Sequence, residues 1–210
     1  LGVQFVCATS GCSVVGIRST PEPPYKILRT DNDIEVRQYE PQLIAETFVS
    51  RSSDVDGDDG RKPPVTRAFR RLAGYIFGGN TQAKSIEMTA PVVQGSRSEE
   101  ISMTAPVLQA PRDGDWWMAF TLPNGYTLDN APTPNDARVK LRAVPAMRMA
   151  TIRYSGRNSP EKMDRFEKTL RTWLATERIT PSGAAQMAGY DPPWTLPFMR
   201  RNEIQIPINE

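Results

Sequence analysis

The sequence predicts a single α+β domain in which one arrangement of strands and helix occurs twice. From residue 25 onward, short runs of alternating apolar and polar residues indicate strands, and two segments carry apolar residues at helical spacing. The order of these elements in the first half returns in the second half. A length of 210 residues suits one domain, or two small halves packed closely together, and the composition of 39% hydrophobic and 24% charged residues is typical of a globular protein.

The first half is expected to consist of strands interrupted by one helix. Alternation of apolar and polar residues, broken at turns and prolines, predicts strands over residues 25–30, 34–39, 43–49, 86–93, 101–108 and 116–122. An acidic loop over residues 50–64 precedes a helix whose apolar stripe comprises Val65, Phe69, Leu72, Ala73 and Ile76. The segment Gly78-Gly79-Asn80 is expected to end this helix, because glycine tolerates positive φ.

The second half repeats this order. Strands are predicted over residues 139–143, 147–154, 185–190 and 203–208. Ser159 as N-cap and Pro160 at the first helical position begin the strongest predicted helix. Its apolar stripe comprises Met163, Phe166, Leu170, Trp173 and Leu174. Because residues 40–47 also line up with residues 144–151, we predict one domain over residues 25–208 with two pseudo-repeats, at about 25–122 and 138–208.

A second, literal repeat lies inside the first half. The segment Met88-Thr89-Ala90-Pro91-Val92 returns at residues 103–107. Since proline cannot donate to a strand ladder, both prolines are expected at strand edges, bulges or ends, which favours a role in closing a barrel. In the alternative interpretation, Met88 or Met103 borders a ligand pocket, because thioethers adapt to flat apolar ligands. A methionine can also serve as a soft ligand of a haem iron.

Composition excludes several classes of function. The 26 basic and 24 acidic residues are interspersed, which argues against nucleic-acid binding because a phosphate-binding surface needs clustered basic residues. The chain has no histidine, so histidine-based triads, histidine–metal clusters and a histidine-ligated haem iron are excluded. No phosphate-binding loop, nucleophile elbow or metal-spaced cluster is present. The sequence therefore predicts no catalytic site and favours a protein that is not an enzyme.

The N-terminal segment resembles a bacterial lipoprotein signal. Residues 1–17 carry no charge, and Thr9-Ser10-Gly11-Cys12 is similar to a lipobox, where a cysteine is acylated after cleavage. We interpret residues 1–24 as a signal remnant and tether, with Cys12 as the lipidation site that anchors the protein to a membrane. Ser13 then favours a periplasm-facing lipoprotein of the bacterial outer membrane. The alternative is a disordered tail with two incidental cysteines.

Three long motifs are similar to the SOUL haem-binding family. They are residues 74–80 (GYIFGGN), residues 86–92 (IEMTAPV) and residues 188–193 (AGYDPP), and the likeness covers nearly all of residues 25–208. The resemblance implies a distorted, mostly antiparallel barrel of duplicated strand–helix–strand–strand units with two helices packed on it. Family members bind haem or other tetrapyrroles in a shallow cleft beside the first helix. Three positions that are basic in haem-binding members align here with Thr66, Gly74 and Thr195.

The first hypothesis is a haem or tetrapyrrole carrier or buffer of the cell envelope. The apolar stripe of the first helix would form the wall of its cleft, together with Met88, and a basic rim would pair with ligand carboxylates through Arg67, Arg70 and Arg71. The alternative for these arginines is a solvated helical face. A second hypothesis is a binding module for other apolar small molecules, as in the effector-binding domains of regulators that share the fold.

A third hypothesis is a hydrolase on the same fold that acts through a buried glutamate. The candidate carboxylates lie at predicted strands or helix ends, and they are Glu46, Glu87, Glu161 and Glu203.

Overall fold

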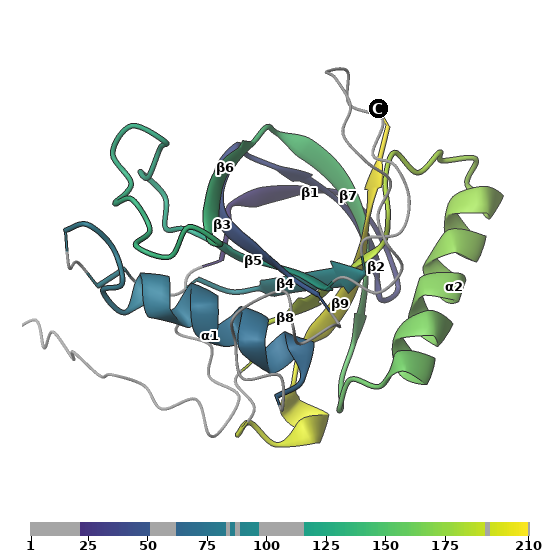
Figure 1. The fold of residues 1–210 in the computed structure, drawn as a ribbon. Helices are drawn as coiled ribbons and strands as arrows, with labels where there is room; N and C mark the ends of the chain where they lie inside the picture. The colour runs from purple at the N-terminus through teal and green to yellow at the C-terminus, as the bar shows by residue number, and fades with distance from the viewer. Residues whose placement is uncertain are drawn as a thin grey trace, which may run out of the picture.

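The protein forms a curled antiparallel sheet with two helices on its outer face (Figure 1). The computed structural model describes residues 22–50, 62–82, 85–86, 89–96, 116–191 and 194–209. Its helices are α1 (Pro64–Ile76) and α2 (Pro160–Thr176), with a short 3-10 helix, η2 (Pro197–Met199). Its strands are β1 (Tyr25–Asp31), β2 (Ile34–Tyr39), β3 (Gln42–Val49), β4 (Val92–Ser96), β5 (Trp116–Thr121), β6 (Lys140–Val144), β7 (Met147–Tyr154), β8 (Gln186–Gly189) and β9 (Asn202–Ile208).

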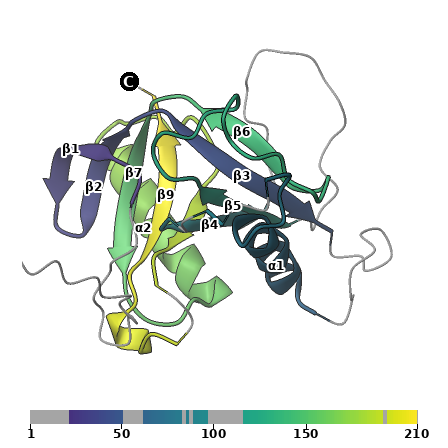
Figure 2. The same cartoon turned by 90° about the vertical axis from the view of Figure 1, so that its left-hand side faces the viewer.

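The nine strands form one sheet in the order β1-β2-β7-β9-β8-β4-β5-β3-β6, and every pair is antiparallel. Only residues 145–146 separate β6, at one edge of this order, from β7 near the other edge. This short connection holds the β6 edge close to β7, so the sheet curls into a half-barrel (Figures 1 and 2). The predicted α+β class and antiparallel sheet are confirmed, whereas the internal duplication stays a prediction.

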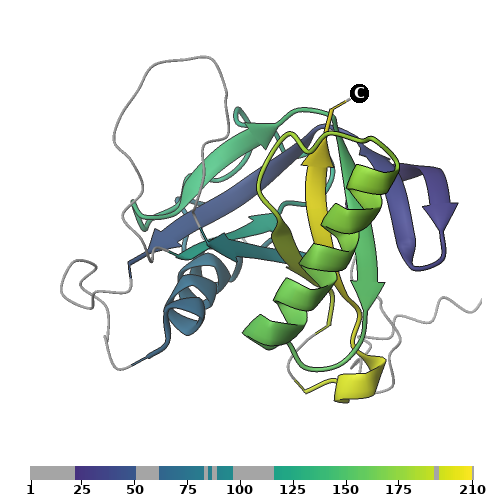
Figure 3. The same ribbon diagram turned by 90° about the vertical axis from the view of Figure 1, so that its right-hand side faces the viewer.

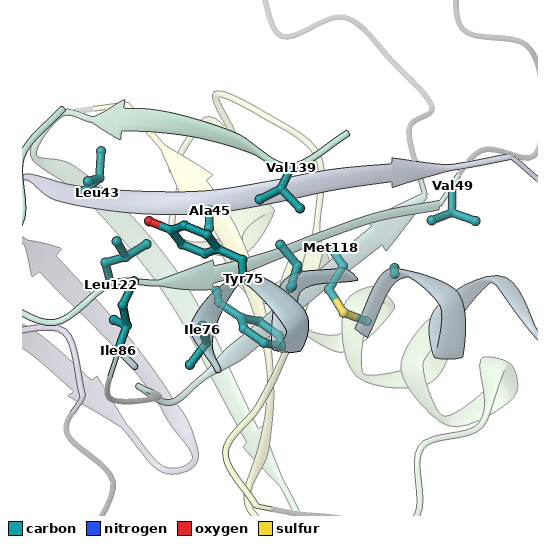
Figure 4. Packing of buried hydrophobic residues seen from close by; sticks show 12 residues of the cluster. Leu43, Ala45, Val49, Tyr75, Ile76, Ile86, Met118, Leu122 and Val139 are labelled. Atoms are coloured by element: carbon teal, nitrogen blue, oxygen red, sulfur yellow. The ribbon is translucent and has the colours of Figure 1, made fainter. Parts of the chain in front are cut away.

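The outer face of the half-barrel carries two hydrophobic cores, one under each helix. Helix α1 packs on β3 and β5, and α2 packs on β7 and β9 (Figures 2 and 3). The core under α1 contains Leu43, Ala45 and Val49 of β3, which pack with Tyr75 and Ile76 of the helix (Figure 4). Side chains alternate along a strand, so Ile44, Glu46 and Phe48 point to the inner face. The residues that line the inner face are therefore set by the same alternation.

The start of α2 and the end of α1 follow the local sequence signals. Ser159 caps α2 by accepting a hydrogen bond from the Lys162 backbone N–H at 3.3 Å, with Pro160 at the first position. Helix α1 ends before Gly78, whose φ is 104°, and the Gly79 N–H donates to the Gly74 carbonyl oxygen at 2.8 Å. The predicted start of α2 and the predicted end of α1 are confirmed.

One predicted strand differs from the structure. Residues 86–93 were expected to form a strand, but the ladder of β4 begins at Val92, directly after Pro91. Proline has no N–H to donate, so pairing with the neighbouring strands starts behind it. The second predicted strand of this pair, over residues 101–108, lies outside the described residues, as do Met88, Met103 and Cys12.

Candidate functional site

The inner face of the half-barrel encloses a cavity of about 520 Å³. This volume lies within the range of about 300–1,000 Å³ that is common for small-molecule pockets. The apolar part of its wall is formed by side chains from five strands, and these are Ile44, Val93, Trp117, Ala119, Val144, Met147 and Met149. Ile44, Ala119 and Val144 form a separate buried cluster. The cavity therefore has a mainly apolar wall and lies on the face of the sheet opposite both helices.

A carboxylate lies within this apolar wall. Glu46 of β3 lines the cavity and is 8% exposed. Arg142 of β6 donates to it from Nε and Nη2, each at 2.9 Å, and the Trp117 indole Nε1 donates at 2.9 Å. This forked arrangement is the strong form of an arginine–carboxylate pair. The side chain of Arg142 is itself 50% exposed, so the pair has a buried acid and a solvent-facing base.

A larger polar network lies on the inner face of β2 and β9. Its centre is Glu203, whose side chain is fully buried. Arg37 donates to the two carboxylate oxygens at 2.8 and 3.0 Å, and Arg201 donates from Nε at 2.9 Å, with its Nη2 2.7 Å from the same oxygen. The Tyr190 hydroxyl donates at 2.7 Å and the Gln205 amide at 3.0 Å. Five donors therefore satisfy this carboxylate.

The network keeps Glu203 ionised. Burial by itself raises the pKa of a carboxyl group, but the hydrogen bonds and charge of Arg37, together with Arg201 and Tyr190, outweigh burial and lower the pKa of Glu203 to about 2. Burial and the Glu203 charge raise the pKa of Tyr190 well above its usual value. Tyr39 is also buried, and this raises its pKa even though Arg37 opposes the shift. Both phenols therefore stay protonated around neutral pH.

Two members of this network reach the cavity. Tyr39 and Gln205 line its wall, and both are at most 5% exposed. The cavity is thus apolar over most of its surface, with polar groups at Tyr39 and Gln205 and at the Glu46–Arg142 pair. Among the described residues, no group of histidine, cysteine, aspartate or glutamate side chains could hold a metal ion.

The apolar stripe predicted to form a pocket wall packs instead on the outer face of the sheet. Leu72 and Ile76 are buried in the core under α1, and Val65 packs against the same cluster. Ala73 is half-buried, and Phe69 is 39% exposed with its ring edge against Phe120. Leu72 and Ile76 offer no surface to a ligand, because the packing of α1 on the sheet covers both side chains.

The three arginines predicted as a rim lie together, but away from the cavity. Arg67, Arg70 and Arg71 line a depression of about 340 Å³ beside α1, together with Asp136 and Arg138. Arg67 and Arg71 are buried and donate to the backbone oxygens of Ser50 and Phe48 at the end of β3. Arg70 is exposed. Two of the three thus tie the helix to the sheet, a role that the sequence pattern did not indicate.

The cavity residues themselves were mostly missed by sequence reasoning. Glu46 and Glu203 were among the candidate carboxylates, whereas Glu161 lies exposed in the first turn of α2 and Glu87 falls outside the described residues. A usable signal existed in β2, where Glu35 and Arg37 alternate with the apolar Ile34 and Val36. The alternation marks one polar face but does not say that this face is enclosed.

An antiparallel half-barrel with helices outside and a cavity inside defines the architectural class of this protein. The family model of the SOUL heme-binding protein matches residues 20–207. The chain therefore belongs to the SOUL heme-binding protein family. Membership of this family suggests binding of haem or another tetrapyrrole. The family predicted from the sequence is confirmed. Comparison with curated proteins gave no match.

Solved structures with the same fold come from proteins of different kinds. The chain is similar to the C-terminal domain of EcmrR, with a TM-score of 0.58, 11% identity, and coverage of 89% of this chain and 98% of that one. A hydrolase from Listeria innocua gives a TM-score of 0.54 and 9% identity over 87% of this chain and 94% of that one. EcmrR in a complex with DNA gives a TM-score of 0.53 and 12% identity over 84% of this chain and 57% of that one. At these identities the likeness shows the fold alone.

No helix among the described residues is long and apolar enough to cross a membrane.

Proposed function

We propose that this protein binds a tetrapyrrole, such as haem, in the cavity on the inner face of the half-barrel and acts as a carrier or buffer. The observation that carries this proposal is the cavity of about 520 Å³, with apolar walls and a few polar groups. A porphyrin is a flat apolar ring with two carboxylates, so it needs this combination of surfaces. Membership of the SOUL family supports the same ligand class.

The lining residues can contact the porphyrin ring, whereas the chain has no histidine to ligate a haem iron. Ile44, Trp117 and Val144 offer apolar contact to a macrocycle, and Arg142 offers a half-exposed cation to a ligand carboxylate. Met147 and Met149 are the soft donors in the wall, and methionine thioethers can serve as axial ligands of haem iron. The proposed site therefore fits the family's ligand, although it lies across the sheet from α1.

The state of the buried carboxylates favours binding over catalysis. Glu46 is held in a forked pair by Arg142, and Glu203 accepts five hydrogen bonds. A general base needs a free lone pair and a pKa near the working pH, and the lowered pKa of Glu203 makes its carboxylate a poor base. The hydrolase hypothesis accordingly has less support than the carrier.

The test is titration of the purified protein with protoporphyrin IX and with haemin, followed by the Soret band and by quenching of tryptophan fluorescence. Met147→Trp and Ala119→Leu reduce the cavity from the wall, and Phe69→Ser alters the outer face beside α1. We expect a loss of affinity of about 10-fold or more for the cavity variants, corresponding to roughly 1.4 kcal/mol or more, and little change for Phe69→Ser. If the spectra of wild type do not change at tens of micromolar ligand, the proposal is wrong. A loss of affinity confined to Phe69→Ser would instead place the site at α1.

A second candidate ligand class is an amphipathic cation, and the observation that favours it is Glu46. A carboxylate in an apolar wall attracts a cation when its own partner can leave, and Arg142 is half exposed. The variant Arg142→Ala would then bind a lipophilic cationic dye more tightly than wild type does. Tighter binding of protoporphyrin than of the dye in both proteins would favour the tetrapyrrole.

We also propose that Cys12 carries a lipid anchor, which would place the protein in the bacterial cell envelope. The lipobox-like segment at residues 9–12 supports this. Expression of the complete gene with and without Cys12→Ser, followed by membrane fractionation and mass measurement, tests it. An unmodified wild-type protein in the soluble fraction is the contrary outcome.

A further inference from the structure

The hydroxyl of Tyr39 occupies an unusual position in the cavity wall. Tyr39 is the last residue of β2 and is only 5% exposed. It borders the cavity beside Gln205. Its ring packs on Tyr25, with centroids 5.1 Å apart. A buried phenol in a cavity wall usually has a partner for its proton, because an unmade hydrogen bond is costly in an apolar setting.

The oxygen of this hydroxyl is used as an acceptor. Arg37 Nη1 donates to it at 3.1 Å, and Gln205 Nε2 lies 3.5 Å away as a second donor. Among the described residues, Tyr39 makes no hydrogen bond in which its own hydroxyl is the donor. The proton is therefore available to a group inside the cavity.

The neighbouring carboxylate cannot take that proton. Glu203 Oε2 already accepts from Arg37 at 2.8 Å, from Tyr190 at 2.7 Å and from Gln205 at 3.0 Å. Glu203 Oε1 accepts from Arg37 Nη2 at 3.0 Å and from Arg201 Nε at 2.9 Å. A carboxylate offers about four lone-pair sites, so five donors leave no acceptor capacity for a sixth.

We infer that the Tyr39 hydroxyl donates a hydrogen bond to a carboxylate of the bound ligand and makes the cavity selective for carboxylic acids over their esters. The inference rests on the proposed function, because it names the ligand group that this end of the cavity recognises. A hydrogen bond to an ionised acceptor is about twice as strong as one to a neutral acceptor, so the acid gains more from Tyr39 than the ester does.

The charged groups nearest the Tyr39 hydroxyl are those of the Glu203 network. The buried core of the network has two cations, Arg37 and Arg201, against the single carboxylate of Glu203. Two further carboxylates pair with these arginines, Glu35 with Arg37 and Glu22 with Arg201, so the network has no net positive charge and the ligand carboxylate is recognised by the hydrogen bond from Tyr39. Arg37 also donates to the phenol oxygen, which polarises the O–H bond towards an incoming acceptor.

The experiment compares two probes, protoporphyrin IX and its dimethyl ester, on wild type and on Tyr39→Phe. The matched control is Tyr25→Phe, which removes the hydroxyl of the adjacent tyrosine. Tyr25 does not line the cavity. A hydrogen bond to a charged group is worth about 1.5–3 kcal/mol, so Tyr39→Phe is expected to weaken binding of the acid by about 10- to 100-fold. Binding of the ester should change by less than about 3-fold, and Tyr25→Phe should leave both affinities unchanged.

The outcomes separate this inference from the proposed function. If wild type binds neither probe, the proposed function fails. If wild type binds both probes and Tyr39→Phe weakens them equally, or neither, the carboxylate role of Tyr39 is overturned and the cavity remains the site. If Tyr39→Phe does not fold, as judged by its thermal midpoint, the two probes are compared on Arg142→Ala, which removes the other cavity group that could pair with a ligand carboxylate. Equal affinity of this variant for acid and ester overturns the inference, and a preference for the acid supports it.

Discussion

The guanidinium of Arg37 lies against the carboxylate of Glu203 in a two-pronged pair, with Nη1 2.8 Å from Oε2 and Nη2 3.0 Å from Oε1. The side chains are 3% and 0% exposed, although they come from strands 166 positions apart in the sequence. The pair joins neither two adjacent strands nor a strand and a helix, because β7 lies between β2 and β9. It therefore spans the inner face of the sheet.

Breaking this pair on one side is expected to be costly. Arg37→Met leaves the Glu203 charge buried with fewer partners, and such changes typically destabilise by about 3–5 kcal/mol. The control is Arg171→Met, which removes an exposed pair with Glu167 and should cost less than about 1 kcal/mol. Urea denaturation of both variants measures the difference, and equal costs for the two variants would contradict the importance of burial.

Stability is expected to fall in acid because of Glu203. Its pKa is lowered to about 2 in the folded protein from 4.5, so between these values the unfolded chain binds more protons than the folded chain. The stabilisation is fully present above pH 4.5 and is lost as pH falls towards 2, with a total on the order of 3 kcal/mol. Urea midpoints at pH 5.5 and 3 measure the loss. Glu203→Gln should show a smaller pH dependence, and an unchanged slope in this variant would assign the acid sensitivity to other carboxyl groups.

Two glycines at the end of α1 are predicted to respond oppositely to alanine. A Cβ on Gly79 would lie 2.6 Å from the Gly74 carbonyl oxygen, so Gly79→Ala must shift backbone and should destabilise by about 1–3 kcal/mol. A Cβ on Gly74 would meet nothing within 4 Å, and Gly74→Ala within the helix should stabilise by about 0.5–1 kcal/mol. Thermal unfolding of the two variants gives the comparison, which fails if both shift the midpoint in the same direction.

The fold followed from the sequence where local signals act alone. Ser159 and Pro160 begin α2 because a capping hydroxyl and a preset φ act within one turn. The alternation in β2 put Ile34 and Val36 into the core under α2. The strand expected over residues 86–93 was wrong in its start, because alternation alone does not show how far Pro91 delays pairing.

The candidate site was harder to predict because the enclosed cavity depends on the curl of the sheet. In β2, Arg37 and Tyr39 occupy the positions that alternation marks as polar, and a polar face of a strand is ordinarily solvated. The curl encloses that face, so Arg37 is only 2% exposed. The ligand site predicted beside α1 stays a prediction, because an apolar stripe with adjacent arginines does not show which of its side chains the sheet will cover.

The stripe of α1 gives a final test of which face binds the ligand. Leu72 is fully buried between α1 and the sheet, and Leu72→Ala is expected to destabilise by about 2–5 kcal/mol because it leaves a cavity in the core. Phe69, at 39% exposure, keeps part of its surface in water, so Phe69→Ala should cost less. If the inner cavity is the site, both variants bind protoporphyrin IX within about 2-fold of wild type at a temperature where they remain folded, because a change of this size corresponds to only about 0.4 kcal/mol. A 10-fold loss of affinity in Phe69→Ala with unchanged stability would instead show that the exposed edge of the stripe contacts the ligand.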